Sequence, residues 1–178
     1  YTTGGLVRDR FEGKNFTEVI FQAMHHQFVA SALATKIAHE KNPDCKVGCM
    51  LTKLTYYPYT CKPEDVLAAQ NYNAIRNWLY LDMAVYGVYN NLVWAYLEEH
   101  DACPEFGEGD EEALNNGHPD FIGFNYYTTS TAEKSDGTEE IDPGADQQSD
   151  RGEAGVYKGY HNPYFCLLYT SPSPRDCS

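Results

Sequence analysis

The feature of this sequence that most constrains its fold is a long helical pattern that leads, after one break, into a short apolar run. Apolar and small residues recur at helical spacing from Val19 to Ile37, behind Asn15, whose side chain can cap a helix start. Asn42-Pro43 ends this helix, because the residue before a proline disfavours helical backbone. Residues 46–51 then lack strict alternation, which predicts a strand buried on both faces of a parallel sheet.

The same order of helix and strand is repeated further along the chain. A helical pattern begins at Pro63 and continues to about His100 with a break near Gly87, and residues 120–128 form a second strand candidate. The segments expected to be loops or turns are 52–62, 101–117 and 131–161. This alternation predicts an α/β protein with a parallel sheet, and by itself it leaves a barrel and an open doubly wound sheet as alternatives.

Composition excludes several classes of partner. The net charge of −13 disfavours nucleic acid and anionic membrane surfaces, both of which need clustered Lys and Arg. No run of 18 apolar residues is present, so no membrane-spanning helix is expected. The six cysteines lack CxxC or Cys/His spacing, so we expect no metal site but reduced thiols, in an acidic cytoplasmic protein.

Five strings, at residues 25–34, 42–50, 57–66, 120–128 and 162–164, occur in unbroken order within residues 4–164, and together they resemble glycoside hydrolase family 1. Residues 25–34 resemble the helix after its fourth strand, and residues 42–50 the entry into its fifth. Residues 120–128 resemble the sixth strand, and residues 162–164 the return to the barrel after a variable loop. Residues 57–66 resemble the bacterial 6-phospho-β-glucosidase branch. The resemblance implies a partial (β/α)8 TIM barrel, from about helix 4 to the loop after strand 6.

The resemblance also implies a retaining β-glycosidase of carbohydrate metabolism, which needs two glutamates and no cofactor. In the family one glutamate lies in an Asn-Glu pair after strand 4, and the other in a Glu-Asn-Gly motif after strand 7. This chain has neither dipeptide, so we expect both catalytic glutamates outside it and the chain alone to be inactive. The expected substrate is a small phospho-β-glucoside. Alternatives are a plain β-glucoside, a 6-phospho-β-galactoside, or a non-catalytic sugar-binding barrel; the oligomeric state stays open.

Two positions carry over from the family as substrate-binding or supporting residues, and a third residue is a weaker candidate. Tyr127 matches the family tyrosine whose hydroxyl bonds the nucleophilic carboxylate, and Asn125 matches an asparagine that lines the site near the acid/base. Tyr57 lies on the loop after a strand and is a candidate to line the cleft, although ordinary loop packing explains it as well. His25 is expected to be a satisfied buried histidine. The carboxylates expected to be solvated rather than catalytic are those of Glu98, Glu99, Asp110, Glu111 and Glu112.

Two positions depart from the family pattern, and the last segment of the chain does not resemble the family. Asn90 stands where the family usually has proline, and Tyr86 where the phospho-branch commonly has arginine. Residues 166–178 read like translated sequencing-adapter DNA, so we expect a barrel segment at 1–165 and a non-native tail at 166–178.

The sequence yields a first prediction, on solubility. A barrel closes only when its strands pair all round the ring, and this segment was expected to supply about two of them. We therefore expect the isolated chain to expose apolar faces and strand edges, and to be poorly soluble or loosely helical. The measurement is a thermal scan combined with light scattering. A monodisperse sample with a sharp cooperative transition would contradict the expectation.

Overall fold

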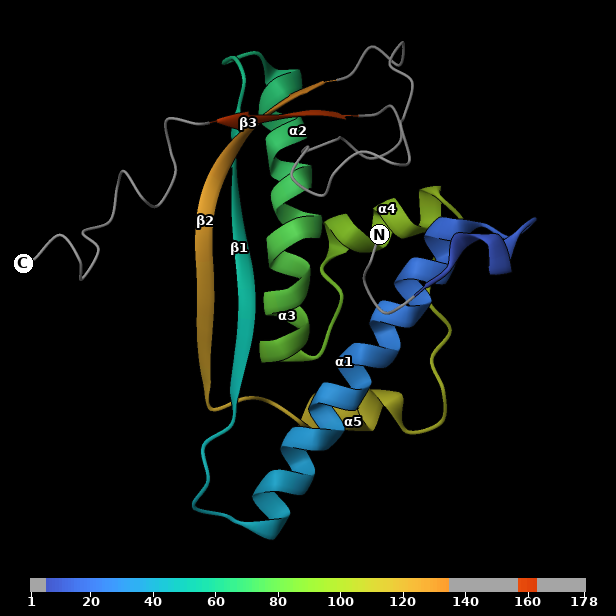
Figure 1. The fold of residues 1–178 in the computed structure, drawn as a ribbon, viewed down its shortest axis with the longest axis vertical. Helices are drawn as coiled ribbons and strands as arrows, with labels where there is room; N and C mark the ends of the chain where they lie inside the picture. The colour runs from blue at the N-terminus through green and yellow to red at the C-terminus, as the bar shows by residue number, and fades with distance from the viewer. Residues whose placement is uncertain (1–5, 135–156, 163–178) are drawn as a thin grey trace, which may run out of the picture. The chain divides into compact units, whose positions relative to one another are not determined.

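The computed structural model of the protein describes residues 6–134 and 157–162, which belong to two compact units (Figure 1). The first unit takes in residues up to Leu51 together with residues 78–123. The second takes in residues 52–77 and the residues from Phe124 onward. The strands β1 (Gly48–Pro58) and β2 (Phe121–Lys134) each contribute residues to both units.

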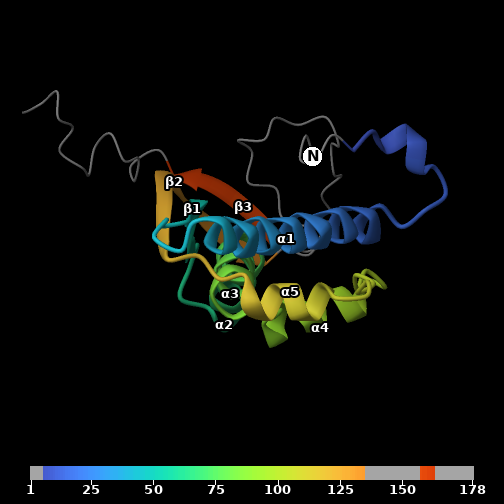
Figure 2. The same ribbon diagram turned by 90° about the horizontal axis from the view of Figure 1, so that it is seen from below.

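The first unit is helical, and its longest element is α1 (Phe16–Lys41), which follows a 3₁₀ turn at Arg8–Phe11. Asn15 caps α1 by accepting a hydrogen bond from the Thr17 N–H at 3.1 Å, and the helix ends at Asn42, so both predicted ends are confirmed. The short helix α5 (Asp110–Asn116) lies against α1 in both views (Figures 1 and 2). It falls in a segment expected to be only turns. That expectation was wrong, because the packing of α5 on α1 is not readable from local sequence.

The predicted helix from Pro63 to about His100 is divided into several elements. These are α2 (Pro63–Asn73), a π-helical turn (Ala74–Trp78), α3 (Leu79–Tyr86) and α4 (Asn91–Glu99). The break predicted near Gly87 is confirmed, since Gly87 ends α3 with a left-handed φ of 69°. The π-helical turn was not predicted from the sequence.

The sheet has the strand order β1-β2-β3, with β3 at Tyr157–Asn162. Backbone bonds join the starts of β1 and β2 (Asp120 N–H to Val47 O, 2.7 Å) and their ends (Tyr59 N–H to Ala132 O, 2.9 Å). These two strands are therefore parallel, as predicted. β3 pairs antiparallel with β2, from Thr129↔Asn162 to Lys134↔Tyr157.

Both main strands extend beyond their predicted bounds, and a third strand joins them. β1 continues through residues 52–58, and β2 and β3 include residues 131–134 and 157–161, all of which were expected to be loop. The sheet accordingly has three described strands rather than about two. Pairing with partners distant in sequence extends the strands, and no local pattern records it. The rest of the predicted 131–161 loop, residues 135–156, lies outside the described residues.

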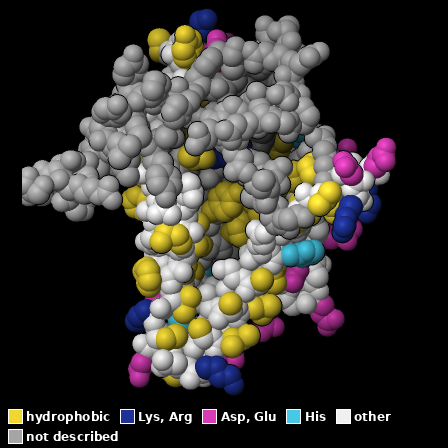
Figure 3. Space-filling view, viewed as in Figure 1, with side chains coloured by type: hydrophobic (Ala, Val, Ile, Leu, Met, Phe, Trp, Pro, Cys, Tyr) yellow, Lys and Arg dark blue, Asp and Glu magenta, His cyan; other side chains and the backbone are white. Residues whose placement is uncertain are grey.

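The expectation that residues 46–51 are buried on both faces of the sheet was wrong. Exposure alternates along the first half of β1, and Met50 is 68% exposed. Phe121 and Phe124 in β2 are also exposed, and apolar side chains show as yellow patches on the surface in Figure 3. Helices cover one face of this part of β1, so every second side chain is left exposed on the other.

Each unit has its own buried residues. In the first unit Leu79, Val93 and Leu97 are fully buried. In the second, Tyr56 stacks on Tyr72 of α2 with ring centroids 4.7 Å apart, beside Ala68, Ala69 and Ala132. Among the described helices, none is both long and apolar enough to cross a membrane.

Gly87 provides a test of how the first unit packs. A Cβ at Gly87 would lie 2.5 Å from the carbonyl oxygen of Leu114, whereas one at Gly109, where φ is 87°, would meet nothing within 4 Å. Gly109→Ala should therefore lower the free energy of unfolding by only the about 1–3 kcal/mol that left-handed backbone costs. Gly87→Ala should lower it further, because the α5 backbone must move. Urea titration followed by circular dichroism measures both, and equal losses would contradict the close packing.

Candidate functional site

The candidate site lies in the second unit, where the parallel strands β1 and β2 end. In α/β barrels the loops that follow the strands carry the chemistry, so the segments after β1 and near the end of β2 are the relevant ones. β1 leads through Tyr59 and Thr60 into α2, which begins with Pro63 at its first turn. Acidic residues in that first turn stabilise the positive end of α2.

Asp65 ties these strand ends together. Its Oδ2 accepts a hydrogen bond from the Thr60 hydroxyl, and its Oδ1 accepts one from the Lys134 N–H at 3.1 Å. The Asp65 residue is only 5% exposed. The Thr60 hydroxyl and then the Lys134 N–H lower the pKa of Asp65, because both bonds favour the ionised carboxylate. One side chain of α2 therefore holds the segment after β1 and the end of β2.

The three predicted site residues all belong to the second unit. Tyr57 is 52% exposed, while its neighbour Tyr56 is packed on Tyr72, so of the two only Tyr57 is accessible to a ligand. Asn125 is exposed in β2. Tyr127 also lies in β2, but its side chain is outside the part that the structure describes. The roles of Tyr57, Asn125 and Tyr127 therefore stay predictions.

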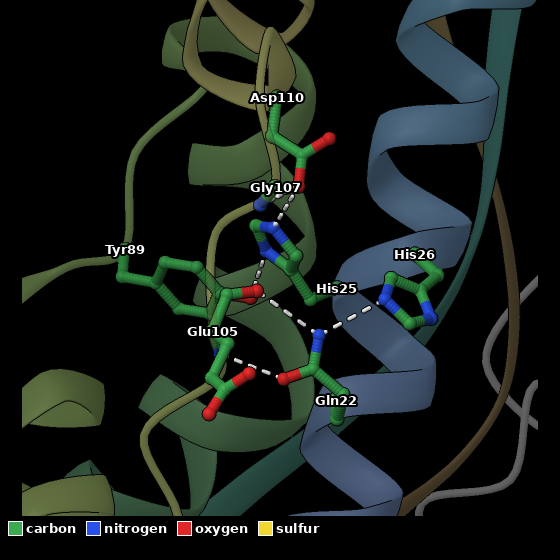
Figure 4. A network of polar contacts seen from close by, with 7 residues as sticks. All are labelled: Gln22, His25, His26, Tyr89, Glu105, Gly107 and Asp110. Carbon is green, nitrogen blue, oxygen red and sulfur yellow. Dashed lines mark hydrogen bonds and ion pairs between the residues drawn. The ribbon is translucent and has the colours of Figure 1, made fainter.

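His25 is a buried, satisfied histidine, as predicted (Figure 4). Its Nδ1 lies 3.0 Å from the Tyr89 hydroxyl and its Nε2 lies 3.2 Å from Asp110 Oδ2, and the ring packs on Phe106. Burial raises the pKa of Tyr89, so its hydroxyl stays protonated. Both ring nitrogens of His25 therefore have a hydrogen-bond partner. His25 is fully buried, so this cluster connects elements and does not act on a substrate.

Asp110 departs from the expectation that the acidic runs are solvated. Its side chain is 18% exposed, and the Gly107 N–H, 2.7 Å from Oδ2, and then His25 lower the pKa of its carboxyl. The expectation failed because His25 lies 85 positions away in sequence. Gln22 also ties α1 to the segment before α5. Its side chain accepts a hydrogen bond from the Glu105 N–H at 2.6 Å and donates one to the Glu105 carbonyl at 3.0 Å.

The other acidic side chains behave as expected. Glu99, Glu111 and Glu112 are exposed, and Glu112 makes only a long 3.8 Å ion pair with Lys36. Glu98, also exposed, accepts a hydrogen bond from the Trp94 indole. Within residues 6–134 and 157–162, no three His, Cys, Asp or Glu side chains are grouped so as to hold a metal ion.

Sequence reasoning missed the polar residues that hold β1 in place. Asp65 was not singled out, although its carboxylate joins α2 to the segment after β1 and to the end of β2. Asn73 and Asn77 were not singled out, yet both bond to the backbone of β1. Their spacing of four on a helical segment places them on one face, which is the only sequence signal that could have revealed them.

The comparisons with known proteins agree with this fold. The family model described as Glycosyl hydrolase family 1 matches residues 2–163, so the chain belongs to that family. It is 46% identical over 132 residues to the aryl-phospho-β-D-glucosidase BglH of Bacillus subtilis, a match that covers 74% of this chain and 28% of that protein. It is 40% identical over 164 residues to the 6-phospho-β-glucosidase AscB of Escherichia coli, a match that covers 92% of this chain and 32% of that protein.

A solved structure leads to the same fold. The β-glucosidase of Thermotoga maritima in complex with glucoimidazole matches with a TM-score of 0.58 and 29% identity, over 66% of this chain and 26% of that one. The fold is therefore α/β and corresponds to part of a TIM barrel, as predicted. The chain spans less than a third of the length of these relatives.

Asp65 leads to a prediction about pH. Its pKa is lowered in the folded state, so its contribution to stability is present above the unfolded value of about 4 and is lost as pH falls through the lower folded value. Asp65→Asn should lower stability at pH 7, and the difference from the unsubstituted chain should shrink below about pH 4. Urea midpoints from pH 7 to pH 2.5 measure this. The exposed neighbour supplies the control: Glu64→Gln removes only a charge at the helix end, so at pH 7 it should lower the urea midpoint less than Asp65→Asn does.

Proposed function

We propose that the protein containing this chain is a retaining β-glycosidase that hydrolyses 6-phospho-β-glucosides. The observation that carries the proposal is the family match over residues 2–163, with phospho-β-glucosidases among the relatives at 40% identity or more. The branch-like segment 57–66 supports it, because it runs from the end of β1 into the start of α2, and barrels of this type bind substrate at the ends of their strands.

The chemistry requires two carboxylates, one to protonate the leaving oxygen and one to attack the anomeric carbon. Neither an Asn-Glu nor a Glu-Asn pair occurs in this chain, so both are assigned to the rest of the protein. Within this chain Tyr127 orients the nucleophile and favours its ionised form by donating a hydrogen bond. Asn125 binds the sugar, and Tyr57 lines the leaving-group side of the cleft. No cofactor takes part in this mechanism.

The substrate, the location and the bounds are parts of the same proposal. We assign a small phosphorylated sugar as the substrate and the cytoplasm as the location, in keeping with the acidic composition. We assign residues 1–165 to the barrel segment and residues 166–178 to a non-native tail, which the family match does not include. The likeness to a β-glucosidase structure keeps a plain β-glucoside as the second candidate substrate.

The test uses the complete reading frame around this chain, with an Asn-Glu upstream and a Glu-Asn-Gly downstream. It should hydrolyse p-nitrophenyl 6-phospho-β-glucoside faster than the unphosphorylated glucoside, and the 178-residue chain alone should hydrolyse neither. Tyr127→Phe should lower kcat by about tenfold or more. It should also move the acidic limb of the pH profile to higher pH, because the ionised nucleophile loses a hydrogen bond that stabilises it.

Tyr86→Phe is the matched control, since Tyr86 is 64% exposed at the end of α3, has no assigned role in the site and should tolerate loss of its hydroxyl. An unchanged kcat in Tyr127→Phe would remove that residue from the mechanism. Turnover by the chain alone would refute the assignment of both glutamates elsewhere. A preference for the plain glucoside would favour the second candidate.

A further inference from the structure

One edge of β1 is bonded by side chains instead of by a strand. In the described sheet β1 has β2 as its strand neighbour. On the other edge of β1, the backbone N–H and C=O groups of Leu54 and Tyr56 bond to the side chains of two asparagines. Asn73 is the last residue of α2, and Asn77 lies in the π-helical turn that follows it. All of these residues belong to the second unit, so the arrangement is internal to one compact body.

Each asparagine bonds both backbone groups of one residue. Asn77 Oδ1 accepts from the Leu54 N–H at 2.9 Å, and its Nδ2 donates to the Leu54 carbonyl. Asn73 Nδ2 donates to the Tyr56 carbonyl at 2.8 Å, and its Oδ1 accepts from the Tyr56 N–H at 3.4 Å. A carboxamide carries an acceptor oxygen and an NH2 group with two donor hydrogens. It can therefore bond the N–H and the C=O of one residue, as a neighbouring strand does, and keep a donor for a further partner.

The two amides also hold each other. Asn77 Nδ2 donates to Asn73 Oδ1 at 2.9 Å, and Asn73 Nδ2 donates to the Ala69 carbonyl at 2.8 Å. Asn77 is only 3% exposed and sits in the π-helical turn at Ala74–Trp78. A π-helical turn leaves some carbonyls of the preceding turn without their ordinary partners, and such turns are frequent at functional sites. The asparagine pair is therefore built into the helix and not a chance surface contact.

We propose that Asn73 and Asn77 are positioning residues that end the strand ladder on this edge of β1 at Leu54. A parallel strand on that edge can bond to the Gly48–Thr52 half of β1, but beyond it the backbone groups are already taken. The remaining part, which leads to Tyr57, is held by α2 and the π-helical turn. Only the link from this segment to the sugar cleft rests on the proposed function.

Packing offers a competing explanation. The stack of Tyr56 on Tyr72 also fixes this part of β1 against α2, and if it alone sufficed the amides would be dispensable. The two explanations differ in what they protect. The amides protect individual N–H groups at Leu54 and Tyr56, whereas the stack holds the strand as a whole.

The experiment measures hydrogen exchange, residue by residue, in the complete protein that contains this chain, with no sugar added. Asn77→Leu should speed exchange of the Leu54 amide by about tenfold or more, while amides in the middle of α2 keep their rates. Asn77→Asp turns a carboxylate oxygen toward the Leu54 carbonyl and Asn73 Oδ1, so at neutral pH it too should speed exchange of the Leu54 amide. Asn116→Ala is the control, because the exposed Asn116 donates to the Glu112 carbonyl within α5 and its loss should change neither amide.

Three results would overturn the proposal. They are an unchanged Leu54 rate in Asn77→Leu, an equal rise over every segment of the second unit, and full exchange of Leu54 and Tyr56 in the unsubstituted chain. No sugar is present, so the outcome is independent of the proposed function. The link to the cleft is read in the complete enzyme, where Asn77→Leu should raise KM about tenfold or more with kcat less affected. If the complete enzyme hydrolyses no glycoside, the proposed function fails while the exchange result stands.

Discussion

The parallel pairing of β1 and β2 is the interaction on which the rest of the structure depends, and the Asp120 carboxylate fixes where it begins. Asp120 accepts from the Val47 N–H at 2.8 Å, contacts His39 Nε2 at 2.8 Å and pairs with Lys46 Nζ at 3.1 Å. These bonds, led by that from Val47, lower the pKa of Asp120. They join the end of α1 to the start of both strands. A slip of one residue would move every side chain of a strand to its other face, so this anchor sets which residues meet the helices.

The far ends of the strands are held by the same kind of chemistry. The Asp65 carboxylate accepts hydrogen bonds from the segment after β1 and from the last residue of β2. The side chains of Asn73 and Asn77 bond to the backbone of β1 along one edge. Between the two ends, apolar packing such as the Tyr56–Tyr72 stack contributes contact area but little directional specificity. Polar side chains at partly buried positions therefore fix the register, because a carboxylate or an amide left without its partners would cost free energy.

The sequence was sufficient where local signals decide the structure. Asn15 and Asn42-Pro43 bound α1, and Gly87 breaks the next helix, because capping and backbone preference act within a few residues. It was insufficient where the partner is distant. The second half of β1 depends on β2 and on two asparagines, and the burial of Asp110 depends on His25. Of the candidate site, Tyr57 and Asn125 are exposed and their roles stay predictions, whereas the asparagines that hold β1 were recognised only in the structure.

Under the proposed function, this chain lies between the two carboxylates and does not contain them. The family resemblance places the glutamates after strands 4 and 7, and β1 and β2 correspond to strands 5 and 6. In a retaining enzyme the two carboxyl groups stand only about 5 Å apart across the sugar. The strands between them must therefore hold their ends steady while presenting side chains to the substrate. Asp65 and the asparagine pair meet the first need, and Asn125, Tyr127 and Tyr57 are assigned to the second. The apolar residues exposed in this segment, such as Met50 and Phe121, then belong to the layers of side chains that fill a closed barrel.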